Sequence, residues 1–97
     1  MNKTDTLLWL MRAHEAVRKL PDGAGINGVD ITLYGSGNRV KVFLNGETGI
    51  KNAVTNSVER YPNTNSGRVE ISDSYGVTYW WGVDFDDNGH IIRRAEA

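Results

Sequence analysis

The most informative absence in this 97-residue chain is cysteine. Without a thiol, the sequence excludes disulfide bridges, thiol nucleophiles and thiolate metal sites, and it is typical of a reducing compartment. No apolar run approaches the roughly 20 residues that a membrane-spanning helix needs. The apolar stretch Leu7–Met11 is also too short for the core of a signal peptide. We therefore expect a cytoplasmic protein that does not enter a membrane.

Excess charge of either sign is also missing. The chain has 11 Lys and Arg residues against 12 Asp and Glu residues, which gives a formal net charge of −1. Proteins that bind nucleic acid without sequence preference normally carry a basic excess, because phosphate neutralisation supplies most of their affinity. The composition therefore argues against a general nucleic-acid binder, but it leaves room for a local basic patch.

The sequence contains no recognisable catalytic or cofactor motif. The Gly-rich segments 23–25 and 35–37 lack the spacing of phosphate-binding loops and of a nucleophile elbow. His14 and His90 lie in no ligand pattern, whereas a zinc site usually needs three or four protein ligands. We therefore expect no enzyme activity, no cofactor and no metal site.

One segment matches the start of a calcium-binding loop. Asp84–Gly89 has the spacing Asp-x-Asp-x-Asn-Gly, but the twelfth position of such a loop requires a Glu, and Ala95 stands there. The alternation of apolar and polar residues on both sides is that of strands, not helices. The segment is better explained as a hairpin turn, in which Asp, Asn and Gly suit the backbone geometry.

Periodic apolar residues run through the whole chain, without a linker or an internal repeat, so residues 1–97 are expected to form a single domain. Helical spacing predicts a first helix over 4–20, which Pro21 ends. A second helix is predicted over 48–60, from apolar side chains three or four residues apart, namely Ile50, Ala53, Val54, Val58 and Tyr61.

Strict alternation predicts five strands, at 29–34, 39–44, 68–72, 77–85 and 90–94. Tight turns rich in Gly, Asn and Asp join them, and strands joined by tight turns are antiparallel. The predicted fold is therefore α+β, with a five-stranded antiparallel sheet, two helices packed on one face, and the order α-β-β-α-β-β-β. The last residues, Arg93–Ala97, are expected to fray into solvent.

With both helices on one face, the opposite face of the sheet is predicted to stay open. It would carry Asp30, Thr32, Tyr34, Arg39, Lys41, Phe43, Arg68, Glu70, Thr78, Trp80 and Asp84. Tyr, Phe, Trp and Arg are the residue types enriched in binding hot spots. The same pattern also fits cross-strand aromatic pairs that only stabilise the sheet, or a face that the loop 62–67 or the C-terminal tail covers.

The leading functional hypothesis is a non-enzymatic protein-binding module that docks this face onto a larger protein or ribonucleoprotein complex. Asp73, Asp84, Asp86 and Asp87 near the C-terminal hairpin would add charge complementarity to a basic partner, although a solvated turn also explains them. The alternative is a single-stranded nucleic-acid binder that stacks bases on Tyr34, Phe43 and Trp80 beside Arg39, Lys41 and Arg68. A smaller patch of Leu8 and Met11 on the first helix suits a weak homodimer or packing under a loop.

In its size, its lack of motifs and cysteine, and its compact α+β layout, the chain resembles the small accessory proteins of phages and mobile elements, of which the anti-CRISPR proteins are an example. The resemblance concerns the general character of the sequence and transfers no residue. It implies a phage-encoded stoichiometric inhibitor that binds a bacterial defence complex, of the CRISPR–Cas type, in the cytoplasm of the host cell.

Overall fold

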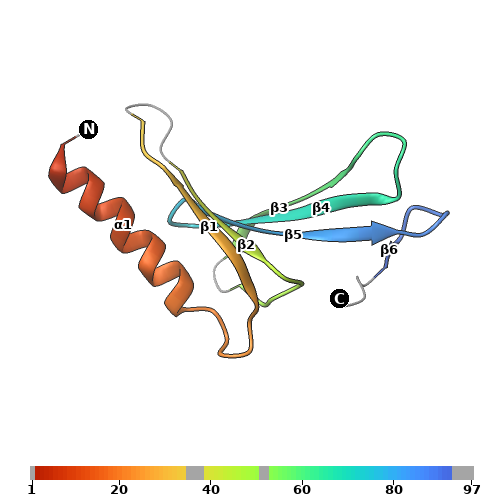
Figure 1. The fold of residues 1–97 in the computed structure, drawn as a ribbon, viewed down its shortest axis with the longest axis horizontal. Helices are drawn as coiled ribbons and strands as arrows, with labels where there is room; N and C mark the ends of the chain where they lie inside the picture. The colour runs from red at the N-terminus through yellow and green to blue at the C-terminus, as the bar shows by residue number, and fades with distance from the viewer. Residues whose placement is uncertain (1, 35–38, 51–52, 93–97) are drawn as a thin grey trace.

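The computed structural model describes residues 2–34, 39–50 and 53–92. Within these ranges the chain forms one helix and six strands (Figure 1). Their bounds are α1 Lys3–Arg18, β1 Ile26–Thr32, β2 Arg39–Leu44, β3 Ala53–Arg60, β4 Ser66–Asp73, β5 Val77–Phe85 and β6 Ile91–Ile92. The α+β class predicted from the sequence is confirmed, whereas the prediction of five strands and two helices is wrong. The last strand was predicted to reach residue 94, and residues 93–97 lie outside the described ranges.

The first helix begins at a side-chain cap. Asn2 precedes α1, and its Oδ1 accepts a hydrogen bond from the Asp5 backbone N–H at 2.8 Å, which satisfies one of the unpaired amides of the first turn. Asp5 in the first turn and Arg18 in the last turn oppose the partial charges of the helix ends. Pro21 then starts a turn, closed by a hydrogen bond from Ala24 N–H to its carbonyl oxygen.

The second helix predicted over 48–60 does not exist, because residues 53–60 form strand β3. This strand pairs antiparallel with β4, from Ala53 opposite Asp73 to Arg60 opposite Gly67. The middle of the segment is Thr-Asn-Ser, three residues with low helix propensity, and the ladder with β4 supplies the backbone hydrogen bonds that a helix would otherwise provide.

The sheet is not wholly antiparallel. Its strand order is β1-β2-β5-β4-β3, and β6 pairs with the end of β5. β2 and β5 run parallel, from Val40 opposite Val77 to Phe43 opposite Trp80, whereas the other pairs are antiparallel. The prediction of an antiparallel sheet is wrong at this pair. β3 runs in the same direction as β2, and the chain then reverses twice, between β3 and β4 and between β4 and β5. β5 therefore runs parallel to β2.

The hydrophobic core lies between α1 and one face of the sheet, which we call the inner face. α1 contributes Ala13 and Ala16, and the strands contribute Val40, Val42, Leu44, Val69, Val77, Tyr79, Trp81, Val83 and Phe85. The predicted alternation is confirmed along all nine residues of β5. Figure 1 shows α1 beside β1 and β2 at one end of the molecule, with β3, β4 and β5 extending away from it.

Among the residues that the structure describes, no helix has the length and apolarity needed to cross a membrane.

Candidate functional site

The sheet face opposite α1, which we call the outer face, carries a stacked aromatic pair on its two central strands. Phe43 on β2 and Trp80 on β5 lie directly opposite each other in the parallel register. Their ring centroids are 4.0 Å apart and their planes differ by 8°. Both side chains are only half-buried, whereas their sequence neighbours Val42 and Trp81, which point to the inner face, are buried. The described helix packs on the inner face, so it leaves this pair uncovered.

A chain of ion pairs runs beside the aromatic pair. The Oε1 atom of Glu70 lies 3.5 Å from Lys41 Nζ and 3.5 Å from Arg68 Nε. Arg68 also reaches across to β3, where its Nη2 lies 3.2 Å from Glu59 Oε2. Arg68 Nε and Glu70 Oε1 are shielded from solvent, yet neither makes a hydrogen bond within the described residues. The contact between them is therefore a charge contact, and both atoms keep unused hydrogen-bonding capacity.

An open hollow of about 320 Å³ borders the pair, and β1 residues line it together with Lys41 and Arg68 of the ion-pair chain. Gly28 of β1 stands directly opposite Phe43, and a Cβ atom placed on Gly28 would meet nothing within 4 Å. Phe43 stacks on Trp80 and also lines this hollow. Asp30 lines the same hollow and is exposed. Its cross-strand neighbour Lys41 pairs with Glu70 instead, so Asp30 makes no ion pair within the described ranges.

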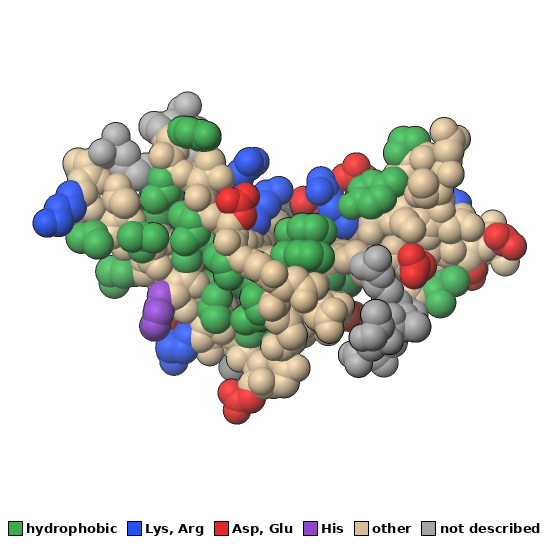
Figure 2. All heavy atoms as spheres, viewed as in Figure 1, with side chains coloured by type: hydrophobic (Ala, Val, Ile, Leu, Met, Phe, Trp, Pro, Cys, Tyr) green, Lys and Arg blue, Asp and Glu red, His purple; other side chains and the backbone are tan. Residues whose placement is uncertain are grey.

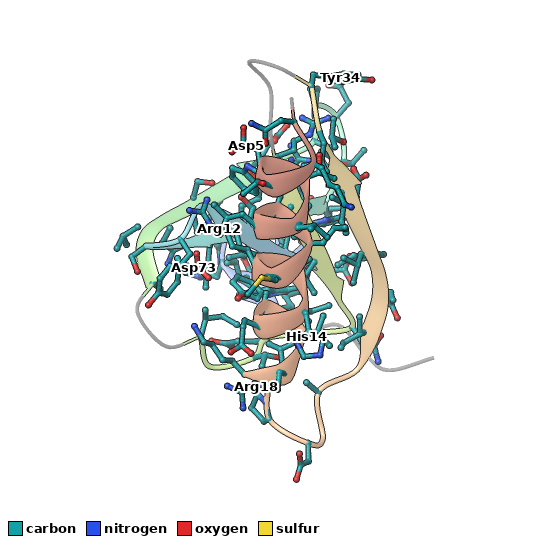
Figure 3. The ribbon with its side chains drawn as sticks, turned by 90° about the vertical axis from the view of Figure 1, so that its left-hand side faces the viewer. Asp5, Arg12, His14, Arg18, Tyr34 and Asp73 are labelled. Carbon is teal, nitrogen blue, oxygen red and sulfur yellow. The ribbon has the colours of Figure 1, made fainter. Side chains whose placement is uncertain are left out.

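The structure does not bring all of the predicted site residues together. Tyr34 follows the end of β1, is 71% exposed and makes no aromatic contact with Phe43 or Trp80 in the described part of the chain. Figure 3 shows it at the far end of β1, pointing away from the rest of the molecule. Arg39 is the first residue of β2, lies opposite Thr32 and is exposed. The predicted cluster of three aromatic residues is therefore a pair and a separate tyrosine.

The acidic residues near the last hairpin have different environments. Asp84 lies on β5, half-buried, and accepts a hydrogen bond from Ser66 Oγ at 3.3 Å. Asp86 Oδ1 accepts the backbone N–H groups of Asn88 and His90, both at 2.9 Å. Asp86 thus shapes the predicted turn, while Asp87 is exposed. No group of three His, Asp or Glu side chains able to hold a metal ion occurs in the described ranges.

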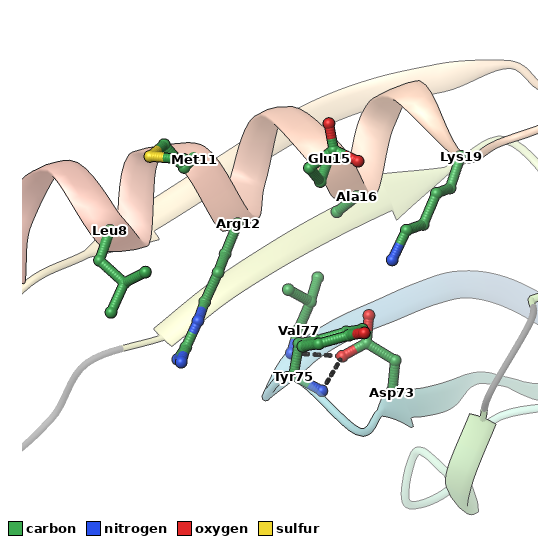
Figure 4. A pocket seen from close by; sticks show the side chains of 9 residues that line it. All are labelled: Leu8, Met11, Arg12, Glu15, Ala16, Lys19, Asp73, Tyr75 and Val77. Carbon is green, nitrogen blue, oxygen red and sulfur yellow. Dashed lines mark hydrogen bonds between the residues drawn. The ribbon is translucent and has the colours of Figure 1, made fainter.

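Sequence reasoning missed a second hollow, of about 390 Å³, between α1 and the turn that joins β4 to β5 (Figure 4). Buried Asp73 forms part of its wall. Asp73 Oδ1 accepts the backbone N–H groups of Tyr75 at 2.9 Å and Val77 at 3.0 Å, and Oδ2 accepts the Tyr79 hydroxyl at 3.1 Å. Burial raises the pKa of the Tyr79 hydroxyl well above its ordinary value, and the Asp73 carboxylate raises it further. Because Asp73 is buried and both of its carboxylate oxygens are engaged, it anchors the turn, and its predicted place in the acidic contact surface is wrong.

The helix side of this second hollow contains Leu8 and Met11, the residues of the predicted homodimer patch. Arg12, Glu15 and Lys19 give it a rim of mixed charge, and Lys19 Nζ lies 4.5 Å from the centroid of the Tyr75 ring. A cation over an aromatic face is an attractive contact. The hollow is therefore partly closed by interactions within the chain, whereas the outer face around Phe43 and Trp80 is not.

No family model, no curated protein and no solved structure matches this chain, so the interpretation of the site depends on its geometry.

Proposed function

We propose that this chain is a protein-binding module, that it acts by docking and not by catalysis, and that the outer face around Phe43 and Trp80 is its contact surface. The supporting observation is the stacked pair itself. Phe43 on β2 and Trp80 on β5 are both half-buried on the outer face, whereas every inward-pointing side chain of these two strands is buried. An aromatic centre with a rim of charged residues matches the anatomy of protein interfaces, in which a few aromatic and Arg side chains carry most of the energy.

The position of the pair favours tight binding because it is already rigid. β2 and β5 lie in the middle of the strand order, each with a paired strand on both sides. Phe43 and Trp80 also hold each other through the stacking contact. Side chains that are ordered before binding lose less conformational entropy when a partner covers them, and that loss is about 0.5–1.5 kcal/mol for each flexible side chain.

The charges around the pair favour a protein partner over a nucleic acid. Lys41 and Arg68 are the cations nearest to the stack, and Glu70 already neutralises part of their charge. Phe43 lines a hollow with Asp30, Lys41 and Arg68. With Glu70 beside them the two cations face two carboxylates, so the site has no excess of positive charge to hold the phosphates of a nucleic acid. A planar cationic side chain, such as an Arg of the partner, would instead stack on Phe43 and pair with Asp30.

The acidic end of β5 supports the same choice of partner. Asp87 is exposed beside Asp84 and Asp86, so the tip of the last hairpin carries negative charge. A negative rim speeds association with a basic surface more than it strengthens the final complex. We therefore expect the salt dependence of binding to appear mainly in the association rate.

The decisive experiment compares a substitution in the stacked aromatic pair with a substitution of an exposed aromatic residue outside the pair. Trp80→Ala removes half of the stacked pair, and Tyr34→Ala removes an exposed aromatic side chain outside it. Bound proteins are recovered from bacterial lysate with each variant and quantified by mass spectrometry, and the affinity of each enriched partner is then measured with purified protein. We expect Trp80→Ala to weaken the complex at least tenfold, which corresponds to about 1.4 kcal/mol, and Tyr34→Ala to leave it unchanged.

Equal recovery by both variants would contradict the proposal. The nucleic-acid alternative has its own arm: a labelled single-stranded oligonucleotide is titrated at low salt, where phosphate contacts are strongest. Binding that Trp80→Ala abolishes would replace the protein-docking proposal with the nucleic-acid one.

The resemblance to anti-CRISPR proteins suggests one class of partner, a bacterial CRISPR–Cas complex, and we extend the proposal to stoichiometric inhibition of such a complex. A phage that the host targets by CRISPR is plated on cells that express this chain. Inhibition restores plaque formation with the wild-type chain and with Tyr34→Ala, but not with Trp80→Ala. Failure of the wild-type chain against several CRISPR–Cas types would remove the inhibitor proposal and leave the docking surface to be tested by the capture experiment.

A further inference from the structure

The molecule exposes more surface than a compact chain of its size. Its accessible surface is 6725 Å², whereas a compact monomer of 10.8 kDa exposes about 5,500 Å². Its radius of gyration is 14.8 Å, against about 12.5 Å for a compact domain of this length. The excess, about 1,200 Å², is larger than the roughly 800 Å² that each partner buries in a standard protein interface.

Part of the exposed surface is an apolar groove between α1 and β1. Val29 and Ile31 of β1 are 43% and 36% exposed, although they lie on the inner face, and Leu10 of α1 is also exposed. These side chains line a hollow of about 540 Å³ together with Ala13, His14, Val17 and Arg18, which we call the α1–β1 groove. Figure 2 shows hydrophobic side chains gathered at this end of the molecule, over α1 and β1.

The same groove borders an unprotected sheet edge. β1 is a terminal strand in the sheet order, so one side of its backbone has no strand partner within the described ranges. Natural edge strands usually avoid self-association through Lys, Pro or several charged residues. β1 has one charged residue, Asp30, and neither Lys nor Pro, whereas the opposite edge strand β3 ends in Glu59 and Arg60. Each of the two edge strands has one register shift near its start, so this feature does not distinguish them. β1 is therefore the edge better suited to pair with another strand.

We propose that a second copy of this chain covers the α1–β1 groove, with β1 of one copy pairing antiparallel with β1 of the other across a two-fold axis. A two-fold interface uses the same patch twice, so the patch must be self-complementary. The α1–β1 groove meets this condition because it combines an unpaired backbone edge with apolar side chains on one side of it. The surface excess belongs to the whole elongated molecule, and this interface would cover part of it.

The charge of Asp30 selects the register of this pairing. Three registers keep inward residues opposite inward residues near the middle of the strand, and the one centred on Ile31 uses only the last three residues of β1, 30–32. Of the other two, one places Asp30 opposite Asp30 of the partner subunit, and like charges directly opposite each other are destabilising. The other places Val29 opposite Val29 of the partner subunit and Asp30 opposite the partner's Gly28, which has no side chain. We assign this last register, in which the two apolar grooves also adjoin.

This inference is independent of the proposed function, because the groove lies on the inner face and the stacked pair on the outer face. Antiparallel pairing of the two edges continues the sheet from one copy into the other and keeps both outer faces on the same side. The dimer would then present two Phe43–Trp80 pairs to one large partner. Such bivalent contact raises the apparent affinity without any new contact in the individual site.

The first test is the molar mass of the full chain in solution. Sedimentation equilibrium at tens of micromolar is expected to give twice 10.8 kDa for the wild-type chain. Ile31→Lys places a charge in the groove and is expected to give a monomer, and circular dichroism confirms that the variant folds. Val58→Lys, on the opposite edge strand at a more exposed position, serves as the control and is expected to remain a dimer.

The second test does not depend on a destabilising substitution. Because the chain has no cysteine, Val29→Cys and Val58→Cys each introduce a single thiol. Residues opposite each other in antiparallel strands have Cα atoms about 4.5–5.5 Å apart, within the range of a disulfide. Mild oxidation is expected to link Val29→Cys into a covalent dimer and to leave Val58→Cys unlinked. A monomeric wild-type chain, a dimeric Ile31→Lys variant, or linkage through position 58 in place of 29 would each overturn the proposal.

Discussion

At the scale of single residues, the turn between β4 and β5 shows how one buried carboxylate organises its surroundings. Asp73 is buried and pairs with no cation in the described residues; three donors satisfy it instead, two backbone N–H groups and the Tyr79 hydroxyl. Removing one donor leaves a buried acceptor unsatisfied, which costs about 1–3 kcal/mol. The raised pKa of Tyr79 follows from the same burial and the same carboxylate.

We expect Tyr79→Phe to lower the free energy of unfolding by about 1–3 kcal/mol near neutral pH. In the wild-type chain the unfolded state loses the Tyr79 proton near pH 10, whereas the folded state keeps it to higher pH because its pKa is raised. The contribution of the hydroxyl is therefore complete below about pH 10 and is lost as the pH rises further.

Urea denaturation of both proteins at a series of pH values from neutral to alkaline measures this difference. It should be constant up to about pH 10 and shrink above it. Tyr75→Phe is the control, because the Tyr75 side chain is exposed. A difference that stays constant or grows in the alkaline range would contradict the assigned role of the hydroxyl.

Gly67 is a second position at which a single side-chain atom, an added Cβ, is expected to lower the stability of the fold. It lies in β4, where an added Cβ would overlap the Glu59 carbonyl oxygen and lie 2.7 Å from Phe85 Cε2. We expect Gly67→Ala to cost about 1–3 kcal/mol, the usual range for overpacking. A Cβ on Gly46 meets nothing within 4 Å, so Gly46→Ala should change the free energy of unfolding by about 0.5 kcal/mol at most. Equal effects in chemical denaturation would show that β3 and β4 do not approach as described.

At the scale of elements, the periodicity of the sequence predicted β5 correctly, but it failed for β3, whose structure depends on pairing with another strand. β5 was predicted correctly because five buried side chains alternate without interruption. In β3 the pattern was ambiguous: Val54 and Val58 are four residues apart, a spacing that places two side chains on one face of a helix and also on one face of a strand. The low helix propensity of Thr-Asn-Ser is a local signal against the helix, but only the ladder with β4 decides the choice.

The contact between β2 and β5 can be tested through the aromatic pair that bridges them. We expect Phe43→Ala and Trp80→Ala to be non-additive, with a coupling energy of about 0.5–1.5 kcal/mol, because each substitution removes the same stacking contact. The measurement is a double-mutant cycle in urea. Additive effects, within about 0.3 kcal/mol, would mean that the rings do not stack in solution.

At the scale of the whole molecule, the candidate site was only partly predictable. Alternation placed Phe43 and Trp80 on the face opposite the core, and the structure agrees. Their direct contact depends on the parallel pairing of β2 and β5, which the sequence did not predict. Alternation also placed Tyr34 on this face, in a strand predicted over 29–34, but β1 ends at Thr32 and the ladder does not fix the direction of the Tyr34 side chain.

The open outer face is the central claim, and residue-resolved oxidative footprinting of the free protein tests it most directly. Hydroxyl radicals modify aromatic side chains according to their access to solvent, and Trp80 and Trp81 are adjacent in sequence but point to opposite faces. Trp81 is 5% exposed, whereas Trp80 is partly open. We expect rapid oxidation of Trp80 and protection of Trp81, and addition of a partner should then protect Trp80. Protection of Trp80 in the free protein, or faster oxidation of Trp81, would contradict the claim.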